Sequence, residues 1–266
     1  YGFRGINYAT VSACASSNHA LINACDIIRL GKADVILCGG SEASVNEPGI
    51  GGFNALHALS TRNDDPATAS RPFDKDRDGF VLGEGAGALV LESLDHALAR
   101  GAKIYAEMKG GTGTADAYHL TAPHPDGLGA ANVMKFSLED AQLNPTDIDY
   151  INVHGTSTPL GDIAELKAIR QVFGDHASKL HISSTKSMTG HLLGATGAIE
   201  AIASIMAINH GIIPPTINHF TDDPEIDPTL NLIFNQAVKK EINTVLSNTF
   251  GFGGHNASVI LARYNT

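Results

Sequence analysis

A chain of 266 residues with 43% hydrophobic and 17% charged residues can bury a sizeable core, which excludes an intrinsically disordered protein. Its 18 basic and 28 acidic side chains leave a formal net charge of −10, and no block of Lys or Arg occurs, which argues against nucleic-acid and anionic-membrane partners. Small molecules or proteins are therefore the expected ligands.

The hydrophobic runs and the cysteines bear on the compartment. The longest runs, such as GALVLES, have the length of a strand and fall far short of the roughly 20 residues that a membrane span needs. Cys14, Cys25 and Cys38 are odd in number and lack CxxC spacing, and no signal-peptide pattern opens the sequence. These features predict a cytoplasmic, reduced protein without a disulfide framework or a metal site.

Hydrophobic periodicity and turn residues predict the elements of the first part of the chain. They are a strand near residues 6–12, a helix near 15–30, strands at 34–39 and 80–92, and a short helix at 93–100. The long connection between the second and third strands is rich in Pro, Asp and Arg, with room for a short helix in GIGGFNALHAL.

From residue 103 onward, strands and helices alternate. The predicted elements are strands at 103–113, 148–153 and 180–183, helices near 128–142, 161–173 and 191–210, and two final strands at 243–250 and 256–263. This βαβαβαββ order is typical of a mixed sheet with helices on its faces, so the predicted fold class is α/β.

The opening βαββ pattern repeats the end of this second unit. Both units also place a chemically loaded turn between a strand and a helix, SACASS in the first and STKSMTGH in the second. We infer a pseudo-duplicated protein whose first half is truncated. Residues 1–102 are the remainder of the N-terminal half, and residues 103–266 are the C-terminal half.

Cys14 is the first candidate for chemistry. A cysteine at a helix N-terminus gains from the positive end of the helix dipole, which lowers the thiol pKa and favours the thiolate. The alternative is a small buried hydrophobic residue, the role expected for Cys25 in mid-helix and Cys38 in mid-strand. The small neighbours of Cys14 in SACASS favour the functional role, because they let a substrate approach the backbone closely.

Three further stretches carry candidates. His154 in NVHGTSTPLGD follows a strand at the sheet edge where ligands bind in open α/β folds, although a structural histidine fits the motif alone equally well. Lys186 and His191 occupy the turn that corresponds to the one carrying Cys14. The glycine-rich NTFGFGGHN at 248–256 is shaped to present backbone N–H groups to a ligand, with an ordinary hairpin as the alternative.

Taken together and in this order, SACASS, HGTSTPLGD, KSMTGHLLGATG and NTFGFGGHN resemble the β-ketoacyl-acyl carrier protein synthases of the thiolase-like superfamily. The resemblance covers essentially the whole chain, including RPFDKDRDGFVLGEGAGALVLE, and is stronger to the type II elongating enzymes than to type I. The chain looks like the C-terminal two-thirds of such an enzyme. The resemblance implies layered thiolase-like sheets and an acyltransferase that performs decarboxylative Claisen condensation in fatty acid elongation.

For the residues, the resemblance implies a Cys-His-His site. Cys14 is the implied nucleophile, His154 and His191 face the malonyl thioester, and Lys186 supports them electrostatically. The implied oxyanion donors are the backbone N–H groups of Cys14 and Phe252. The other implied residues are Thr156, Thr158, Phe250, Phe252 and Gly253 for substrate binding, with Glu200 and Glu165 in support.

The resemblance also implies the partners. No bound cofactor is expected, because the phosphopantetheine arm arrives on an acyl carrier protein that bears the acyl or malonyl thioester. A homodimer is expected, with the strand near 6–12 as the sheet edge that pairs two subunits. Two residues depart from the family pattern. His255 replaces the usual threonine, and His57 replaces a frequent arginine, which removes a fixed positive charge for docking an acidic carrier.

Two alternatives stay open. A polyketide ketosynthase shares every motif above, and an inactive ketosynthase-like partner or a fragment without turnover shares the fold. Inactive partners characteristically lack the nucleophile, so the presence of Cys14 with both histidines favours an active enzyme.

Overall fold

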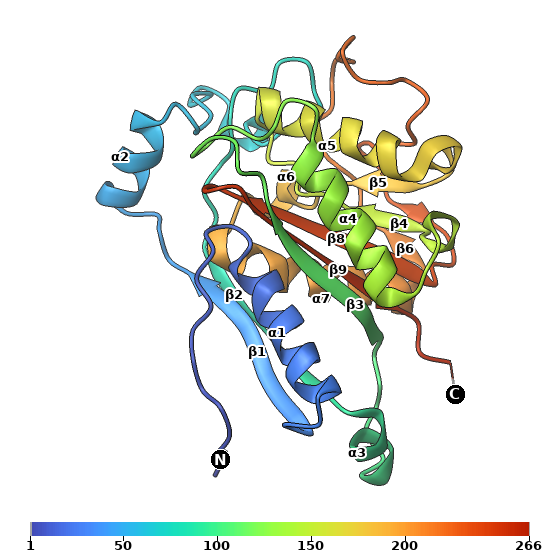
Figure 1. Ribbon diagram of the computed structural model, residues 1–266. Helices are drawn as coiled ribbons and strands as arrows, with labels where there is room; N and C mark the ends of the chain where they lie inside the picture. Colours follow the sequence, from blue (N-terminus) through green and yellow to red (C-terminus); the bar gives the residue numbers. More distant parts are fainter. Residues whose placement is uncertain (1, 266) are drawn as a thin grey trace.

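The computed structural model of the chain describes residues 2–265 and confirms the predicted α/β architecture (Figure 1). The elements of the first part are α1 (Ser16–Arg29), β1 (Val35–Glu42), α2 (Glu47–Ala55), β2 (Gly85–Glu92) and α3 (Leu94–Ala99). Those of the second part are β3 (Glu107–Ala115), α4 (Leu128–Ala141), β4 (Tyr150–Asn152), α5 (Pro159–Phe173), β5 (His181–Ser183), α6 (Lys186–Thr189), α7 (Thr196–His210), β6 (Ile212–Ile213), β7 (Val238–Lys239), β8 (Thr244–Gly251) and β9 (His255–Ala262). Short 3-10 turns connect some of them, at η1 (Pro66–Thr68), η2 (Pro145–Asp147), η3 (Gly174–Ser178) and η4 (Leu193–Ala195).

The main sheet has five strands in the order β3-β9-β8-β4-β5. β4 pairs in parallel with β5 and β8, whereas β9 runs antiparallel to β8 and β3, so the sheet is mixed as predicted. β8 and β9 are buried along most of their length because helices cover both faces of the sheet.

The helices and sheets form layers (Figure 1). α4 and α5 pack on one face of the main sheet, and α1 and α7, which contact each other, pack on the other. On their far side, α1 and α7 contact the antiparallel pair of β1 and β2. Along the chain, α1 precedes the antiparallel pair β1 and β2, and α7 precedes the antiparallel pair β8 and β9 with the short strands β6 and β7 inserted between, so the predicted repeat is interrupted in the second half.

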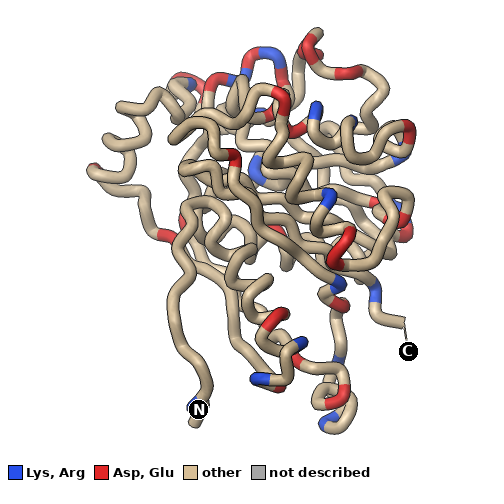
Figure 2. The backbone as a smooth tube through the Cα atoms, viewed as in Figure 1, with Lys and Arg blue, Asp and Glu red and all other residues tan. Residues whose placement is uncertain are grey.

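Two hydrophobic clusters fill the space on either side of the main sheet. The cluster under α4 and α5 includes Met134, Leu138, Ile151, Leu166 and Ile169, and the cluster under α1 and α7 includes Leu21, Ile208, Val245 and Val259. Charged residues lie mainly in loops and near helix ends around this core (Figure 2). No helix between residues 2 and 265 is long and apolar enough to cross a membrane.

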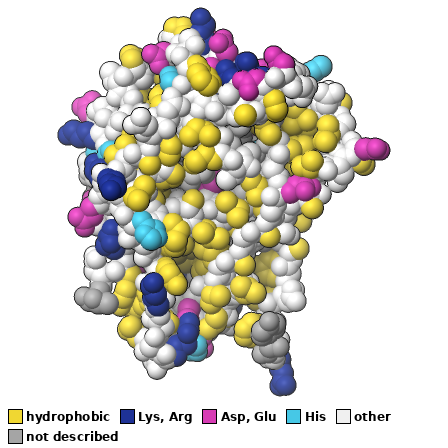
Figure 3. Space-filling model, turned by 180° about the vertical axis from the view of Figure 1, so that it is seen from behind, with side chains coloured by type: hydrophobic (Ala, Val, Ile, Leu, Met, Phe, Trp, Pro, Cys, Tyr) yellow, Lys and Arg dark blue, Asp and Glu magenta, His cyan; other side chains and the backbone are white. Residues whose placement is uncertain are grey.

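Hydrophobic side chains also reach the surface. The face seen in Figure 3 carries patches of them over much of its middle. On the sheet formed by β1 and β2, Leu37 and Val90 are directly paired neighbours, and their side chains are 62% and 59% exposed.

The predicted strand near 6–12 is wrong. Residues 2–9 are exposed and belong to no ladder, and only an isolated bridge between Ser12 and Cys14 follows. A strand needs a neighbour to satisfy its backbone groups, and no described strand lies alongside this segment. The sheet edge that was expected to pair two subunits is therefore not formed by the described residues.

The predicted helix near 191–210 is shorter than expected. The chain forms the single turn α6, then His191, then η4, and the long helix α7 begins only at Thr196. Leu193 has a φ of +44°, a left-handed conformation that interrupts any continuous helix through this stretch.

Candidate active site

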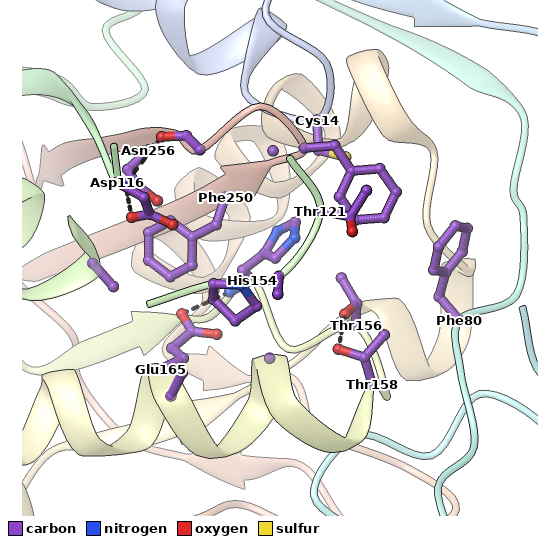
Figure 4. Close-up of a pocket in the computed structure, with 18 of the residues that line it drawn as sticks. Cys14, Phe80, Asp116, Thr121, His154, Thr156, Thr158, Glu165, Phe250 and Asn256 are labelled. Carbon is purple, nitrogen blue, oxygen red and sulfur yellow. Dashed lines mark hydrogen bonds between the residues drawn. The ribbon is translucent and has the colours of Figure 1, made fainter. Parts of the chain in front are cut away.

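One pocket gathers most of the residues that the sequence singled out (Figure 4). Its lining includes Cys14, His154, His191, Thr156, Thr158, Glu165, Phe250 and Phe252. It also includes Phe53, Phe80, Asp116, Thr121, His124, Leu193 and Asn256, which sequence reasoning did not single out. Lys186, Glu200 and Gly253 are not among the residues that line the pocket.

Cys14 lies on a tight turn directly before α1. Ala13 has a φ of +50°, which is uncommon for a residue other than glycine, and the Ala15 N–H donates to the Ser12 carbonyl at 3.1 Å. This turn places the thiol in the pocket, where its Sγ is 3.1 Å from Nε2 of His191.

The protonation state of Cys14 differs from the prediction. Burial raises the pKa of the thiol to about 11, which outweighs the lowering effects of the Lys186 charge and of the Phe252 backbone N–H. The free thiol is therefore protonated at neutral pH. The lowered pKa that the helix N-terminus predicted for Cys14 is wrong, because desolvation of the thiolate raises the pKa more than these favourable contacts lower it.

His154 and His191 face each other edge to face. Their ring centroids are 5.3 Å apart with an interplanar angle of 86°. Nδ1 of His191 is 3.0 Å from the Thr196 hydroxyl, which leaves Nε2 directed at Cys14. Burial lowers the pKa of both imidazoles well below the usual range, and the Lys186 charge adds to this effect. Both rings are neutral at pH 7 and can each donate one N–H.

Lys186 lies beneath the histidines. Its Nζ donates to Oε1 of Glu200 at 2.5 Å, and the two side chains are 1% and 2% exposed. Burial raises the pKa of Glu200 to about 7, and the ammonium of Lys186 opposes this shift. The pair puts a fixed positive charge close enough to lower the pKa of Cys14 and of both histidines.

Glu165 holds the turn that carries His154. Its carboxylate accepts the N–H of His154 at 2.9 Å, the N–H of Gly155 at 2.8 Å and the amide of Asn248 at 3.1 Å. Burial raises the pKa of this carboxyl group to about 7, although these three donors lower it in part. The sequence placed Glu165 as a supporting residue, and the contacts are those of a backbone anchor (Figure 4).

The glycine-rich turn between β8 and β9 reaches the thiol. A Cβ on Gly251 would lie 3.0 Å from the Ser12 carbonyl oxygen and 3.1 Å from the Cys14 nitrogen, so the close approach requires glycine. The backbone N–H groups of Phe252 and Cys14 both act on the Cys14 sulfur. An oxyanion hole needs donors directed at the oxygen of the attacked carbonyl, and two N–H groups this close to the nucleophile are the candidates for that role.

The other residues of this turn have different positions. The Phe250 ring packs against His154, with centroids 5.6 Å apart. Gly253 has a φ of +87°, and its N–H donates to the Leu120 carbonyl at 2.7 Å. Gly253 therefore fixes the turn to the loop after β3 and does not face the pocket.

The pocket mouth is polar on one side and aromatic on another. The hydroxyls of Thr156 and Thr158 are 3.0 Å apart (Figure 4). Across the pocket, the Asn256 amide donates to Asp116 at 2.8 Å. Phe53 and Phe80 make an edge-to-face pair with centroids 5.4 Å apart. Phe53 lies in α2 and Asp116 directly follows β3, and their local sequence patterns do not show that either side chain lines a pocket.

The remaining singled-out residues lie away from the reacting atoms. Cys25 and Cys38 are half-buried outside the pocket, and burial raises the pKa of both thiols. His57 is exposed after α2. His255 packs edge to face against His19, with centroids 6.5 Å apart.

Two family models match the chain. The model described as beta-ketoacyl synthase, N-terminal domain, matches residues 1–97, and the one described as beta-ketoacyl synthase, C-terminal domain, matches residues 105–220.

About half of the chain's residues are identical in the curated relatives that it matches. It is 52% identical over 263 residues to the 3-oxoacyl-[acyl-carrier-protein] synthase 2 of Synechocystis sp. and to the chloroplastic 3-oxoacyl-[acyl-carrier-protein] synthase I of Hordeum vulgare. It is 51% identical to the 3-oxoacyl-[acyl-carrier-protein] synthase 2 of Staphylococcus aureus. These alignments take in 99% of this chain and 63%, 56% and 63% of the relatives, so the chain spans about three-fifths of their length.

Solved structures agree in fold. A beta-ketoacyl synthase from Burkholderia phymatum superposes with a TM-score of 0.91 at 44% identity, over 96% of this chain and 61% of that one. A type II polyketide synthase acyl-carrier protein in complex with its ketosynthase, bound to a hexaketide, gives 0.92 at 42% identity, over 95% and 62%. These similarities confirm the layered thiolase-like architecture.

Proposed function

Because this chain belongs to the β-ketoacyl synthase family, we propose that it condenses an acyl thioester with malonyl-acyl carrier protein to give 3-oxoacyl-acyl carrier protein. The observation that carries this proposal is the placement of a buried thiol 3.1 Å from one neutral imidazole, with a second neutral imidazole beside it. The elongation step of fatty acid synthesis needs this combination of a nucleophile and two hydrogen-bond donors.

In the first half-reaction the Cys14 sulfur attacks the acyl thioester carbonyl. A bond forms between Cys14 Sγ and the acyl carbon, the bond to the pantetheine sulfur breaks, and the thiol proton leaves with the pantetheine. The N–H groups of Cys14 and Phe252 stabilise the oxyanion of the tetrahedral intermediate. The Lys186 charge favours the thiolate as it forms.

In the second half-reaction malonyl thioester loses carbon dioxide. The bond to the carboxylate carbon breaks and its electron pair forms an enolate, whose oxygen accepts hydrogen bonds from His154 and His191. The enolate carbon attacks the acyl group on Cys14, and the thiolate of Cys14 leaves. We assign the proton of the His191 ring to Nε2, and the Thr196 hydroxyl, 3.0 Å from Nδ1, then donates to Nδ1 and favours this tautomer.

An acyl carrier protein is the proposed partner. One solved neighbour is an acyl-carrier protein in complex with its ketosynthase, and the curated relatives are named for a carrier-bound substrate. The hydroxyls of Thr156 and Thr158 at the pocket mouth are the proposed contacts of the phosphopantetheine arm. No other cofactor is proposed, a homodimer is the proposed assembly, and the cytoplasm is the proposed compartment.

A polyketide ketosynthase is the second candidate, because solved neighbours at 42–43% identity come from polyketide and chain-length-factor systems. The curated relatives at 51–52% identity are named for 3-oxoacyl-carrier synthesis, which favours fatty acid elongation. An inactive partner is disfavoured because Cys14, His154 and His191 meet in one pocket.

Turnover tests the proposal. The purified protein is incubated with a series of acyl-carrier thioesters and malonyl-carrier, and the 3-oxoacyl product is measured by mass spectrometry. Even-numbered saturated acyl chains should be elongated, and Cys14→Ala should abolish the product. If the protein elongates only polyketide chains, it is assigned to the polyketide pathway. If it forms no 3-oxoacyl product from any carrier thioester, the condensing activity is refuted.

A further inference from the structure

The backbone N–H and carbonyl of Gly194, in η4, are both hydrogen-bonded to side chains of the first part of the chain. Its N–H donates to Oε2 of Glu42, the last residue of β1, at 3.1 Å. Its carbonyl accepts a hydrogen bond from the hydroxyl of Ser17, a fully buried residue of α1. Glu42 itself is held by the Ser44 hydroxyl, which donates to its other oxygen.

The η4 turn that carries Gly194 is strained. Leu193, directly before Gly194, has a φ of +44°, a left-handed conformation that is unfavourable for a residue other than glycine. Such a conformation persists only where the surroundings impose it. The Leu193 side chain is buried in one small cluster with Cys14 and Phe80.

The turn lies between His191 and the residue that orients its ring. The backbone of His191 is fixed on its near side, because its N–H donates to Val81 and its carbonyl accepts from Gly83. The ring is oriented from the far side of η4, where the Thr196 hydroxyl meets Nδ1 at 3.0 Å. The side chains of the pocket wall contact η4 through the hydrophobic cluster of Leu193, whereas the hydrogen bonds to the Gly194 peptide come from Glu42 and Ser17.

We propose that Glu42 is a positioning residue, which clamps the Gly194 peptide so that Leu193 stays left-handed and Thr196 keeps Nε2 of His191 directed at Cys14. This inference rests on the proposed function, because it assigns Glu42 to the decarboxylation step that His191 serves. Glu42 touches neither the substrate pocket nor the histidine.

The charge of Glu42 has a second, opposite effect that makes the clamp testable. Its carboxylate is close enough to Cys14 to raise the pKa of the thiol. Removing the charge should therefore make Cys14 easier to ionise, while removing the hydrogen bond should impair His191. A general loss of structure would also expose the buried thiol and speed its alkylation, so the charge is removed separately in Glu42→Gln, in which only the alkylation rate should change.

The experiment compares Glu42→Ala and Glu42→Gln. Malonyl-thioester decarboxylation reports on His191, and alkylation of Cys14 by iodoacetamide at pH 7 reports on the thiol. Glu42→Ala should slow decarboxylation by at least about tenfold, the effect of losing a hydrogen bond to a charged group, and should speed alkylation. Glu42→Gln keeps an acceptor for Gly194, so it should decarboxylate within about threefold of the wild type and alkylate faster.

The matched control is Glu84→Ala. Glu84 also accepts one backbone N–H in the same region, that of Val45 at 2.8 Å, but does not contact η4. Both readouts should stay at wild-type values in this variant. If Glu42→Ala fails to fold, Thr196→Val takes its place, with slower decarboxylation and unchanged alkylation expected.

Three results would overturn the clamp: wild-type decarboxylation in Glu42→Ala, equal losses in Glu42→Ala and Glu42→Gln, or wild-type decarboxylation in Thr196→Val. A wild-type protein that never decarboxylates malonyl thioester would instead refute the proposed function. The clamp is then judged by the ¹⁵N spectrum of the His191 ring, which should lose its single Nε2–H tautomer in Glu42→Ala and keep it in Glu42→Gln. An unchanged spectrum in Glu42→Ala would overturn it.

Discussion

Replacing either pocket histidine by alanine should separate the two half-reactions. His154→Ala and His191→Ala each remove one N–H donor to the enolate oxygen and leave Cys14, Phe252 and the oxyanion turn in place. Condensation should therefore fail while Cys14 still accepts an acyl group from a thioester.

The expected loss of rate follows from the protonation state of the two imidazole rings. Burial and the Lys186 charge lower the pKa of both imidazoles, so at pH 7 each is a neutral donor in the pocket. Removal of one preorganised oxyanion donor costs about 3–4 kcal/mol, which corresponds to roughly 160- to 900-fold in rate. The double variant should lose less than the product of the two effects, because the donors act on one oxygen.

The assay measures carbon dioxide release from malonyl thioester and, separately, acylation of Cys14 by intact-protein mass spectrometry. The control is His176→Ala, because His176 lies outside the pocket and its ring Nε2 is hydrogen-bonded to the Ile148 carbonyl, at 3.0 Å. Loss of acylation and decarboxylation to the same degree in His154→Ala would refute this division of labour. So would a decarboxylation rate within about threefold of the control, since the lost donor should cost far more.

Three further expectations concern protonation and packing. Because burial raises the pKa of Cys14 to about 11, alkylation of the free protein should rise about tenfold per pH unit between roughly pH 6 and pH 9, and a plateau below pH 8 would contradict it. Burial raises the pKa of Glu165 from 4.5 to about 7, so the folded state holds this proton more tightly than the unfolded state, and the contribution of the group to stability falls as pH rises across that window. Glu165→Gln removes the effect, so urea titrations at pH 5 and pH 7.5 should show the variant gaining on the wild type at the higher pH; a constant difference would argue against a raised pKa. Gly251→Ala puts a Cβ 3.0 Å from the Ser12 carbonyl and should reduce acylation of Cys14 more than about tenfold in a folded protein, as circular dichroism and mass spectrometry would report.

The sequence predicted most of the fold because long elements carry a strong periodic signal. α1, α4 and α5 begin and end within about two residues of the expected positions, where Pro159 and glycines mark the boundaries. The strand near 6–12 failed because strand formation depends on a partner, which local propensity does not report. The start of α7 was misplaced because Leu193 adopts a conformation that a leucine rarely takes.

The site was predictable where residues sit at turns beside strands and helices. Turn position alone left a structural role open for His154, and it was the family resemblance that implied one site of Cys14, His154 and His191, which do line one pocket. The raised pKa of Cys14 could not be predicted from the sequence, because desolvation depends on which residues cover the thiol in three dimensions. The pairing of Asp116 with Asn256 joins residues 140 positions apart, and nothing in either local pattern foretells it.

The most direct test of the account is intact-protein mass spectrometry after reaction with an acyl-carrier thioester. We expect one acyl adduct, mapped to Cys14 and absent from Cys25 and Cys38, that disappears when malonyl-carrier is added and 3-oxoacyl-carrier is formed. An adduct spread over the three cysteines, or one on Cys14 that malonyl-carrier leaves unchanged, would contradict the proposed condensation.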